Sequence, residues 1–288
     1  MAGILYLVAT PIGNLGDFTP RAVETLENAD FIAAEDTRVS MKLLNHFGVK
    51  KPLISYHEHN HVTAGQSVLN RLLAGESCAL MTDAGTPAIS DPGEDLVKQC
   101  AEAGITVCAI PGPCAAITAL SMSGLPTGRF TFEGFLSTTK KNRAQHLDSL
   151  RAEQRTMIFY EAPHKLCATL RDLAAAFGGE RRISLCRELT KLHEEVLRLT
   201  LDGAVAYYET QPPRGEYVLI VEGAPKQQES GPVSEEEALM RVQALLAEGL
   251  SRKDAIRQVA AETGPCDLSH FSRMFREVTA RRREMPRC

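Results

Sequence analysis

Short apolar runs alternate with helix-like segments through the first 112 residues of this 288-residue chain. The apolar runs, which we expect to be strands, lie at 4–9, 31–34, 53–55, 78–81 and 106–110. The segments between them, at 20–26, 39–47, 64–73 and 94–103, have the length and pattern of helices. Strands and helices that alternate in this way form βαβ units. The pattern therefore predicts an α/β fold with a mainly parallel sheet and helices on both of its faces.

A second α/β unit is predicted after the Gly-Leu-Pro turn at 124–126. Its expected strands lie at 131–133, 156–160, 183–186, 195–199 and 217–221, and a polar linker follows at 222–232. The rest of the chain has the pattern of three short helices, at 234–247, 252–262 and 268–280. A chain of this length can form several domains. We expect an N-terminal α/β domain at 1–114, a second α/β domain at 115–224 and a small helical module at 233–288.

A long loop rich in glycine, proline and small polar residues, 82–93, follows the fourth predicted strand. Gly85 and Gly93 permit positive φ angles and a close approach of the backbone to a ligand. Two further special loops, at 10–14 and 111–115, follow the first and fifth strands. Ligands of open α/β sheets bind outside the carboxyl ends of the strands. We therefore expect the three loops to face one ligand-binding crevice, rather than to be three ordinary turns.

Polar side chains follow other predicted strands as well. The segment 35–38 carries two carboxylates and an arginine, which could orient a substrate or take up a proton. A simpler interpretation is that Asp36 or Thr37 caps the next helix. In the second unit, two segments at strand ends, 159–164 and 186–191, and the segment 215–217 that opens the last strand could close a crevice between the two α/β domains.

Three histidines alternate with other residues after the third predicted strand, at His57, His59 and His61. In an extended segment their imidazoles would lie on one side and could bind a metal ion, as in a metal-dependent phosphoesterase. The sequence offers no further His/Asp pairing at a ligand-like spacing. We therefore expect a polar, substrate-facing loop and no metal.

The net charge of −4 conceals two basic zones. Residues 138–182 and residues 252–288 each hold nine Lys or Arg against five acidic residues. Basic zones on an otherwise acidic chain suggest an anionic partner, with nucleic acid the first candidate, or simply solvated helix faces. The basic start of a predicted helix at 138–143 could contact phosphate or could be a solvated helix terminus.

The cysteines and the apolar runs bear on the compartment. The eight cysteines form no C-x-x-C pair, and most fall within apolar runs. Buried thiols in a reducing cytoplasm fit this pattern better than disulfides or zinc ligands. Charged residues interrupt every apolar run before it could span a bilayer, so we expect no membrane partner.

Five segments in combination carry a family resemblance: 10–14, 34–38, 82–87, 111–115 and 187–191. Together they closely resemble the small-subunit ribosomal RNA methyltransferases of the tetrapyrrole methylase superfamily, over residues 4–223. The helical tail also resembles the small helix-turn-helix-like module of that family, although its motifs are weaker.

The resemblance implies an activity, a cofactor and partners. It implies that S-adenosylmethionine (SAM) binds as methyl donor in the cleft between the two α/β domains. It implies 2′-O-methylation of a cytidine in the decoding centre of 16S rRNA within the 30S subunit. It further implies a homodimer.

The resemblance also implies site residues. The implied donor-binding residues are Asp83, Ala84, Gly85, Thr86, Ile89, Pro111, Gly112, Pro113, Cys114, Ala115, Tyr160, Arg187, Glu188 and Leu189. Acceptor-side candidates combine the loop after the first strand with the polar and basic segments described above; they are Pro11, Gly13, Asn14, Glu35, Arg38, Lys140, Lys141 and Arg143. Gly13 and Asn14 match a Gly-Asp turn of the superfamily with Asn in place of Asp, which fits an acceptor other than a porphyrin.

Methyl transfer from a sulfonium is an in-line displacement that needs positioning but no metal. A ribose hydroxyl is a very weak acid, so a base or an alkoxide-stabilising cation must lie near it. The candidates are Asp36, His57, Glu58 and Lys191. Three alternatives remain open at this point: a tetrapyrrole or other small-molecule acceptor, an RNA-binding assembly factor without catalysis, and a metal-dependent hydrolase built on the three histidines.

Overall fold

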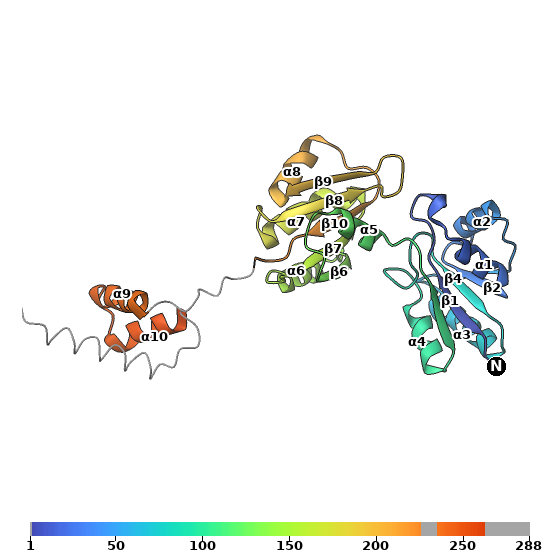
Figure 1. Ribbon diagram of the computed structural model, residues 1–288, viewed down its shortest axis with the longest axis horizontal. Coiled ribbons are helices and arrows are strands. Elements are labelled where there is room, and N and C mark those ends of the chain that lie inside the picture. Colours follow the sequence, from blue (N-terminus) through green and yellow to red (C-terminus); the bar gives the residue numbers. More distant parts are fainter. Residues whose placement is uncertain (1, 226–234, 263–288) are drawn as a thin grey trace, which may run out of the picture. The chain divides into compact units, whose positions relative to one another are not determined.

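The computed structural model describes residues 2–225 and 235–262 (Figure 1). The chain divides into two compact units, Met1–Ala224 and Pro225–Cys288. The first unit contains two five-stranded sheets, and the described part of the second unit contains two helices.

The first sheet is parallel throughout. It consists of β1 (Ile4–Val8), β2 (Phe31–Ala34), β3 (Leu53–Ser55), β4 (Cys78–Met81) and β5 (Thr106–Ile110), in the order β3-β2-β4-β1-β5. Its connections are the short helix η1 (Leu15–Asp17) and the helices α1 (Pro20–Asn28), α2 (Thr37–His46), α3 (His61–Leu73) and α4 (Glu94–Glu102).

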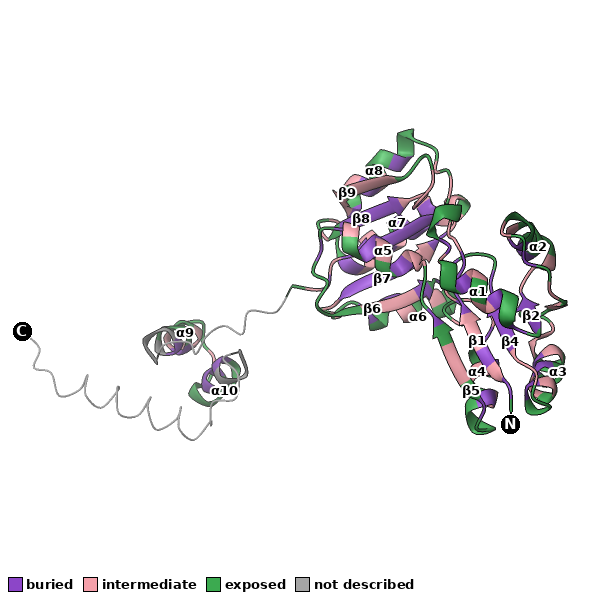
Figure 2. Cartoon of the chain, turned by 45° about the vertical axis from the view of Figure 1, so that its right-hand side comes forward, coloured by how far each residue is buried: buried purple, intermediate pink, exposed green. Residues whose placement is uncertain are grey.

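Helices cover both faces of this sheet, because successive strand residues point to opposite sides. On one face, Ile32 and Ala34 pack with α1 and α2 through Leu26 and Leu44. On the other face, Phe31 and its neighbours pack with α3 and α4 through residues such as Val68 and Leu96. The predicted two-sided parallel sheet is therefore confirmed, and Figure 2 shows that β2 and β4 are buried.

The helix starts follow from their capping residues. Thr19 accepts a hydrogen bond from the Ala22 N–H at 3.1 Å, and Pro20 occupies the first turn of α1. Asp36 caps α2 by accepting from the Arg38 N–H at 2.8 Å. Helix α2 therefore begins two residues before the predicted start.

The second sheet is mixed. It consists of β6 (Phe130–Phe135), β7 (Thr156–Glu161), β8 (Arg182–Arg187), β9 (Glu195–Thr200) and β10 (Tyr217–Val221), in the order β6-β7-β10-β8-β9. Only the β6/β7 pair is parallel; the other three pairs are antiparallel. Helix α5 (Ala115–Met122) packs on one face, whereas α7 (Pro163–Phe177) and α8 (Leu201–Thr210) pack on the other. Helix α6 (Lys140–Ser149) contributes Leu147 to the same core as α7.

The described part of the second unit is a pair of helices, α9 (Glu235–Ala247) and α10 (Arg252–Glu262). Their apolar contact includes Ala238, Val242, Ala255, Ile256 and Val259. The third predicted helix, 268–280, lies outside the described residues. In the described part of the chain, no helix is long and apolar enough to cross a membrane.

Candidate functional site

Three loops meet at the carboxyl edge of the first sheet, as the sequence predicts. The sheet order places β4, β1 and β5 side by side. Thr10 and Gly85 exchange two backbone hydrogen bonds, of 2.8 and 3.1 Å, which join the loops after β1 and β4. The Thr86 hydroxyl donates to the Pro113 carbonyl at 3.1 Å and joins the loop after β5. These bonds hold the three loops as one surface.

The loop between β4 and α4 has an unusual backbone. Gly85 and Gly93 have φ angles of 90° and 138°, and a Cβ at Gly93 would lie 2.8 Å from a Leu80 methyl. Ala88 and Ser90 also have positive φ, at 66° and 60°, although neither is glycine. Backbone conformations of this kind cost energy and cluster at ligand-binding sites. The observed strain therefore supports a binding role for this loop.

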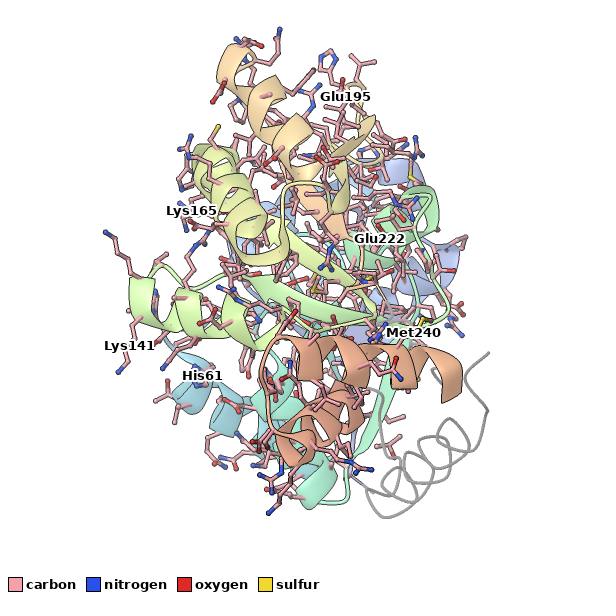
Figure 3. The ribbon with its side chains drawn as sticks, turned by 90° about the vertical axis from the view of Figure 1, so that its left-hand side faces the viewer. His61, Lys141, Lys165, Glu195, Glu222 and Met240 are labelled. Atoms are coloured by element: carbon pink, nitrogen blue, oxygen red, sulfur yellow. The ribbon has the colours of Figure 1, made fainter. Side chains whose placement is uncertain are left out.

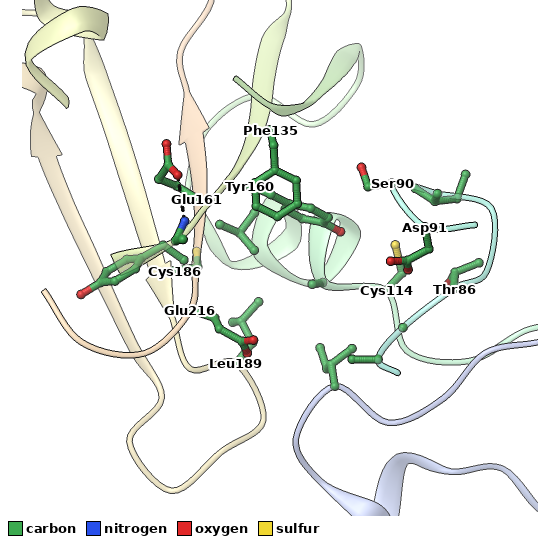
Figure 4. A pocket seen from close by; sticks show the side chains of 18 of the residues that line it. Thr86, Ser90, Asp91, Cys114, Phe135, Tyr160, Glu161, Cys186, Leu189 and Glu216 are labelled. Carbon is green, nitrogen blue, oxygen red and sulfur yellow. Dashed lines mark hydrogen bonds between the residues drawn. The ribbon is translucent and has the colours of Figure 1, made fainter. Parts of the chain in front are cut away.

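A pocket of about 420 Å³ lies between this loop surface and the second sheet (Figure 4). This volume is in the range of pockets that bind small ligands. Its lining from the loops after β1, β4 and β5, up to the first residue of α5, is Ile12, Ala84, Gly85, Thr86, Ile89, Ser90, Asp91, Cys114 and Ala115. Its lining from the second sheet and adjoining loops is Phe135, Tyr160, Glu161, Ala162, Pro163, Cys186, Leu189, Lys191, Glu216, Tyr217 and Val218.

Asp91 is the carboxylate that the first-sheet loops contribute to the pocket lining. Burial raises the pKa of Asp91 to about 7, and the negative charges of Glu35 and Asp83 contribute to the same shift. Burial also raises the pKa of Glu35 and that of Asp83. Asp91 is thus the pocket carboxylate whose charge responds to pH near neutrality, and a cationic ligand would favour its ionised form.

The Asp91→Asn variant is expected to be more stable than the wild type above neutral pH. The folded-state pKa lies above the ordinary value of 3.8, so folding disfavours the carboxylate. This cost is absent below about pH 4 and complete above about pH 7. We expect a gain at pH 8 on the order of 1 kcal/mol, or ~2–4 °C in Tm, and no gain at pH 4. Thermal unfolding at both pH values measures it, with Asp17→Asn as the exposed control; equal Tm shifts at both pH values would contradict the assignment.

Lys191 lies where the two halves of the pocket meet. Its Nζ lies 3.0 Å from Glu188 Oε1 and 2.7 Å from Glu216 Oε2. Partial burial opposes the charge, but the two carboxylates outweigh it and raise the pKa of Lys191. A Cβ on Gly13 would lie only 2.4 Å from Lys191 Cγ, so the glycine allows the lysine stem to cross the loop after β1. The site therefore holds a fixed ammonium group between the loop after β1 and the loops of the second sheet.

Comparisons with known proteins agree with this geometry. The family model for tetrapyrrole (corrin/porphyrin) methylases matches residues 4–205. The ribosomal RNA small subunit methyltransferase I of Synechocystis sp. is 55% identical, over 91% of this chain and 93% of the relative. The protein of the same name from Halalkalibacterium halodurans is 50% identical over 91% of each chain. The chain belongs to the ribosomal RNA small subunit methyltransferase I family of tetrapyrrole methylases. The predicted family and the predicted enzyme class, a methyltransferase, are confirmed.

Solved structures share the tetrapyrrole methylase fold. Uroporphyrin-III C-methyltransferase from Thermus thermophilus aligns with a TM-score of 0.53 and 21% identity, over 76% of this chain and 94% of its own. Diphthine synthase aligns with a TM-score of 0.59 and 14% identity, over 77% of this chain and 90% of its own. At these identities the likeness shows the fold alone, and it confirms the predicted fold class.

Eight of the donor-binding residues that the family resemblance implies line the pocket: Ala84, Gly85, Thr86, Ile89, Cys114, Ala115, Tyr160 and Leu189. The other six, which are Asp83, Pro111, Gly112, Pro113, Arg187 and Glu188, adjoin the lining without belonging to it. Among them, Arg187 pairs with Glu195 at 3.1 Å, and a Cβ on Gly112 would lie 3.0 Å from Ala9 Cβ. These contacts indicate that Arg187 and Gly112 stabilise the strand end and the loop around the pocket. Direct contact of the six residues with a donor stays a prediction.

Of the four candidates for activating a hydroxyl, Lys191 alone lines this pocket. Asp36 caps α2 and pairs with Arg38 at 2.6 Å; the hydrogen bonds from Arg38 lower the pKa of Asp36, which makes it a weak base. His57 and Glu58 lie in a turn before α3, outside the pocket lining.

The histidine segment is not extended. It forms a turn, and His61 begins α3 with its Nε2 at 3.3 Å from Asp95 Oδ2. His57 accepts a hydrogen bond from the His59 N–H at 3.2 Å. Within residues 2–225 and 235–262, no three His, Cys, Asp or Glu side chains are arranged to hold a metal ion.

The acceptor-side candidates fall into two groups. Arg143 is 15% exposed, with Nε 2.6 Å from Asp172 and Nη2 2.9 Å from the Thr169 hydroxyl, so it stabilises the α6–α7 contact. Lys140 and Lys141 are exposed, and neither forms an ion pair with another described residue. Figure 3 shows the Lys141 side chain extending away from α6. These two lysines, unlike Arg143, are available to a phosphate.

The remaining acceptor-side candidates lie near the first-sheet loops. Pro11, Gly13 and Asn14 follow β1, and Asn14 Oδ1 accepts from the Gly16 N–H at 2.9 Å to start η1. Glu35 and Arg38 flank the start of α2 after β2.

Several lining residues are not among the predicted site residues. They differ in how far the sequence indicates that they belong to the site. Asp91 belongs to the loop 82–93, whose composition already marked it. Cys186 and Val218 are strand residues that face α5 and look like ordinary core in the sequence. Phe135 enters the site through a distortion of β6 that no local pattern indicates.

Proposed function

We propose that this protein transfers a methyl group from SAM to the 2′-hydroxyl of a cytidine in the decoding centre of 16S rRNA. The observation that carries the proposal is the 55% identity, over 91% of the chain, to a ribosomal RNA small subunit methyltransferase. The ribose position and the nucleotide come from the family resemblance of the motif segments. The enzyme acts as a homodimer, as that resemblance also implies, and in the cytoplasm, as the cysteine pattern indicates.

The pocket suits the donor in size and charge. SAM supplies an activated methyl group on a sulfonium, and it also carries an ammonium group. The pocket of about 420 Å³ offers an aromatic side chain at Tyr160 and a carboxylate at Asp91. The hydroxyl of Tyr160 accepts a hydrogen bond from the Ala116 N–H at 3.2 Å, which fixes the ring. These groups can pair with the positive charges and cover the apolar surface of the donor.

Lys191 is assigned the role of stabilising the ribose hydroxyl as it attacks the methyl group. With its raised pKa it stays protonated at neutral pH, so it does not take the proton itself. Its ammonium instead stabilises the negative charge that develops on the ribose oxygen. The exposed carboxylate of Glu216, which is hydrogen bonded to Lys191, offers a nearby acceptor for the proton. Glu188 holds the ammonium from the other side.

Binding of the RNA is assigned to exposed cations. Lys140 and Lys141 at the start of α6 and Arg38 at the start of α2 are the candidates for phosphate contacts. Binding that rests on such contacts weakens steeply as salt concentration rises. A target nucleotide in folded rRNA must leave its stack to reach a pocket of this kind.

The proposal is tested by incubating the full chain with methyl-labelled SAM and candidate acceptors. The acceptors are 30S subunits from cells lacking the protein, purified 16S rRNA, 50S subunits and a porphyrin precursor. We expect label in 30S subunits or in 16S rRNA and background in the other two. Label confined to the porphyrin precursor, or no label despite measurable SAM binding, would overturn the proposed acceptor.

A further inference from the structure

Strand β6 contains a bulge beside the pocket. Its pairing with β7 runs Phe132 opposite Ile158 and then Gly134 opposite Phe159, so Glu133 is an extra residue. Side chains three positions apart on a regular strand point to opposite faces. The bulge cancels this alternation and brings Phe132 and Phe135 onto the same face.

Both phenylalanines contact one ring as a result. The ring centroids of Phe132 and Phe135 lie 5.1 and 5.5 Å from that of Tyr160, at interplanar angles of 74° and 63°. Figure 4 shows Phe135 beside Tyr160 within the pocket. Because Tyr160 is fixed through Ala116, it gives Phe135 a rigid support.

Phe135 nevertheless remains largely uncovered. The residue is 58% exposed, and Ile89, from the loop between β4 and α4, is 46% exposed in the same pocket. The residues next to them in the chain, Gly134 and Ser90, lie close together: a Cβ on Gly134 would lie 3.3 Å from the Ser90 hydroxyl. Two large apolar side chains thus stand exposed on the lining, one from each half of the first unit.

We propose that Phe135 and Ile89 form a clamp that stacks a nucleobase. The inference rests on the proposed function, which supplies two such bases: the adenine of the donor and the base of the target nucleotide. A flat, uncharged ring matches an exposed phenylalanine that is held edge-on by a fixed tyrosine. Stacking on an aromatic side chain is a common way to hold an unpaired base.

The test compares Phe135→Ala and Phe135→Trp with Phe130→Ala in the full chain. Phe130 is the matched control, because it is 39% exposed at the other end of β6 and outside the pocket. Calorimetry gives the Kd for SAM and for methionine, which lacks adenine, and filter binding gives the Kd for 30S subunits. Thermal unfolding checks that each variant is folded.

The two sources of the base give different results. If the clamp holds the donor adenine, Phe135→Ala weakens SAM binding about tenfold and leaves methionine binding unchanged. If it holds the target base, the variant weakens 30S binding about tenfold and leaves SAM binding within about twofold. In both cases Phe135→Trp, which keeps an aromatic ring, retains the wild-type affinity. Affinities within about twofold of wild type for both ligands, or an equal loss in Phe130→Ala, would overturn the clamp.

These measurements separate this inference from the proposed function. Both read binding rather than turnover, so they remain informative even if the wild type methylates none of the acceptors. That failure would refute the proposed function, whereas a wild type that transfers methyl groups and an unaffected Phe135→Ala variant would refute the clamp alone.

Discussion

Replacing Lys191 with Met is expected to lower kcat for methyl transfer about 100- to 1,000-fold. The substitution keeps the length and apolar stem of the side chain but removes the ammonium that Glu188 and Glu216 hold at the pocket. A fixed charge aimed at a developing oxyanion contributes to the transition state and little to the ground state. We therefore expect the Kd for SAM to change by less than about threefold.

Single-turnover kinetics with 30S subunits and calorimetry with SAM measure the two effects of Lys191→Met separately. Lys98→Met, an exposed lysine on α4 outside the pocket, is the matched control and should retain wild-type activity. Because the carboxylates raise the pKa of Lys191, this group should not titrate in the wild-type kcat profile near neutral pH. A kcat within about threefold of wild type in Lys191→Met would remove Lys191 from the mechanism.

Gly13→Ala is expected to lower kcat about 10- to 100-fold by displacing the same lysine. The new Cβ would lie 2.4 Å from Lys191 Cγ, 3.0 Å from its Cε and 3.0 Å from the Thr190 hydroxyl. The segment from Glu188 to Thr190 has little freedom to adjust, since both of these residues already have positive φ, at 53° and 66°. The ammonium must therefore move, and small misplacements of a catalytic group are costly.

Gly128→Ala is the control for Gly13→Ala, because a Cβ there would meet nothing within 4 Å. A double-mutant cycle between Gly13→Ala and Lys191→Met shows whether the alanine acts through the lysine. If the alanine acts through the lysine, the double variant is no slower than Lys191→Met alone. Independent, additive losses would show that Gly13 acts in another way, such as by binding the acceptor directly.

The strands and helices could be predicted where local signals are strong. Strands β4 and β10 occur at the predicted bounds, because each is a short apolar run between turn signals. The start of α2 differs from the predicted one, because the sequence allows Asp36 to be either a cap or a functional group, and the structure shows that it caps the helix. The mixed second sheet was not predicted, since strand direction depends on which strands become neighbours and not on any one run.

The candidate site was predictable as far as the loops, but not beyond them. Loop composition and position on the sheet indicated Gly85 and Thr86, which line the pocket. Arg143 pairs with Asp172, which lies 29 positions away in the sequence. The sequence does not show this partner, so Arg143 is predicted there as a phosphate contact. Phe135 depends on the register of β6 against β7, which a single strand does not encode.

A map of ribose methylation across 16S rRNA shows directly whether this protein methylates a cytidine ribose in the decoding centre. It uses 30S subunits from cells lacking the protein, before and after incubation with SAM and either the wild type or Lys191→Met. One new 2′-O-methylcytidine in the decoding centre, formed by the wild type and about 100-fold more slowly by Lys191→Met, is the predicted result. Methylation of a base, methylation at scattered riboses, or an unchanged map despite SAM binding would contradict it.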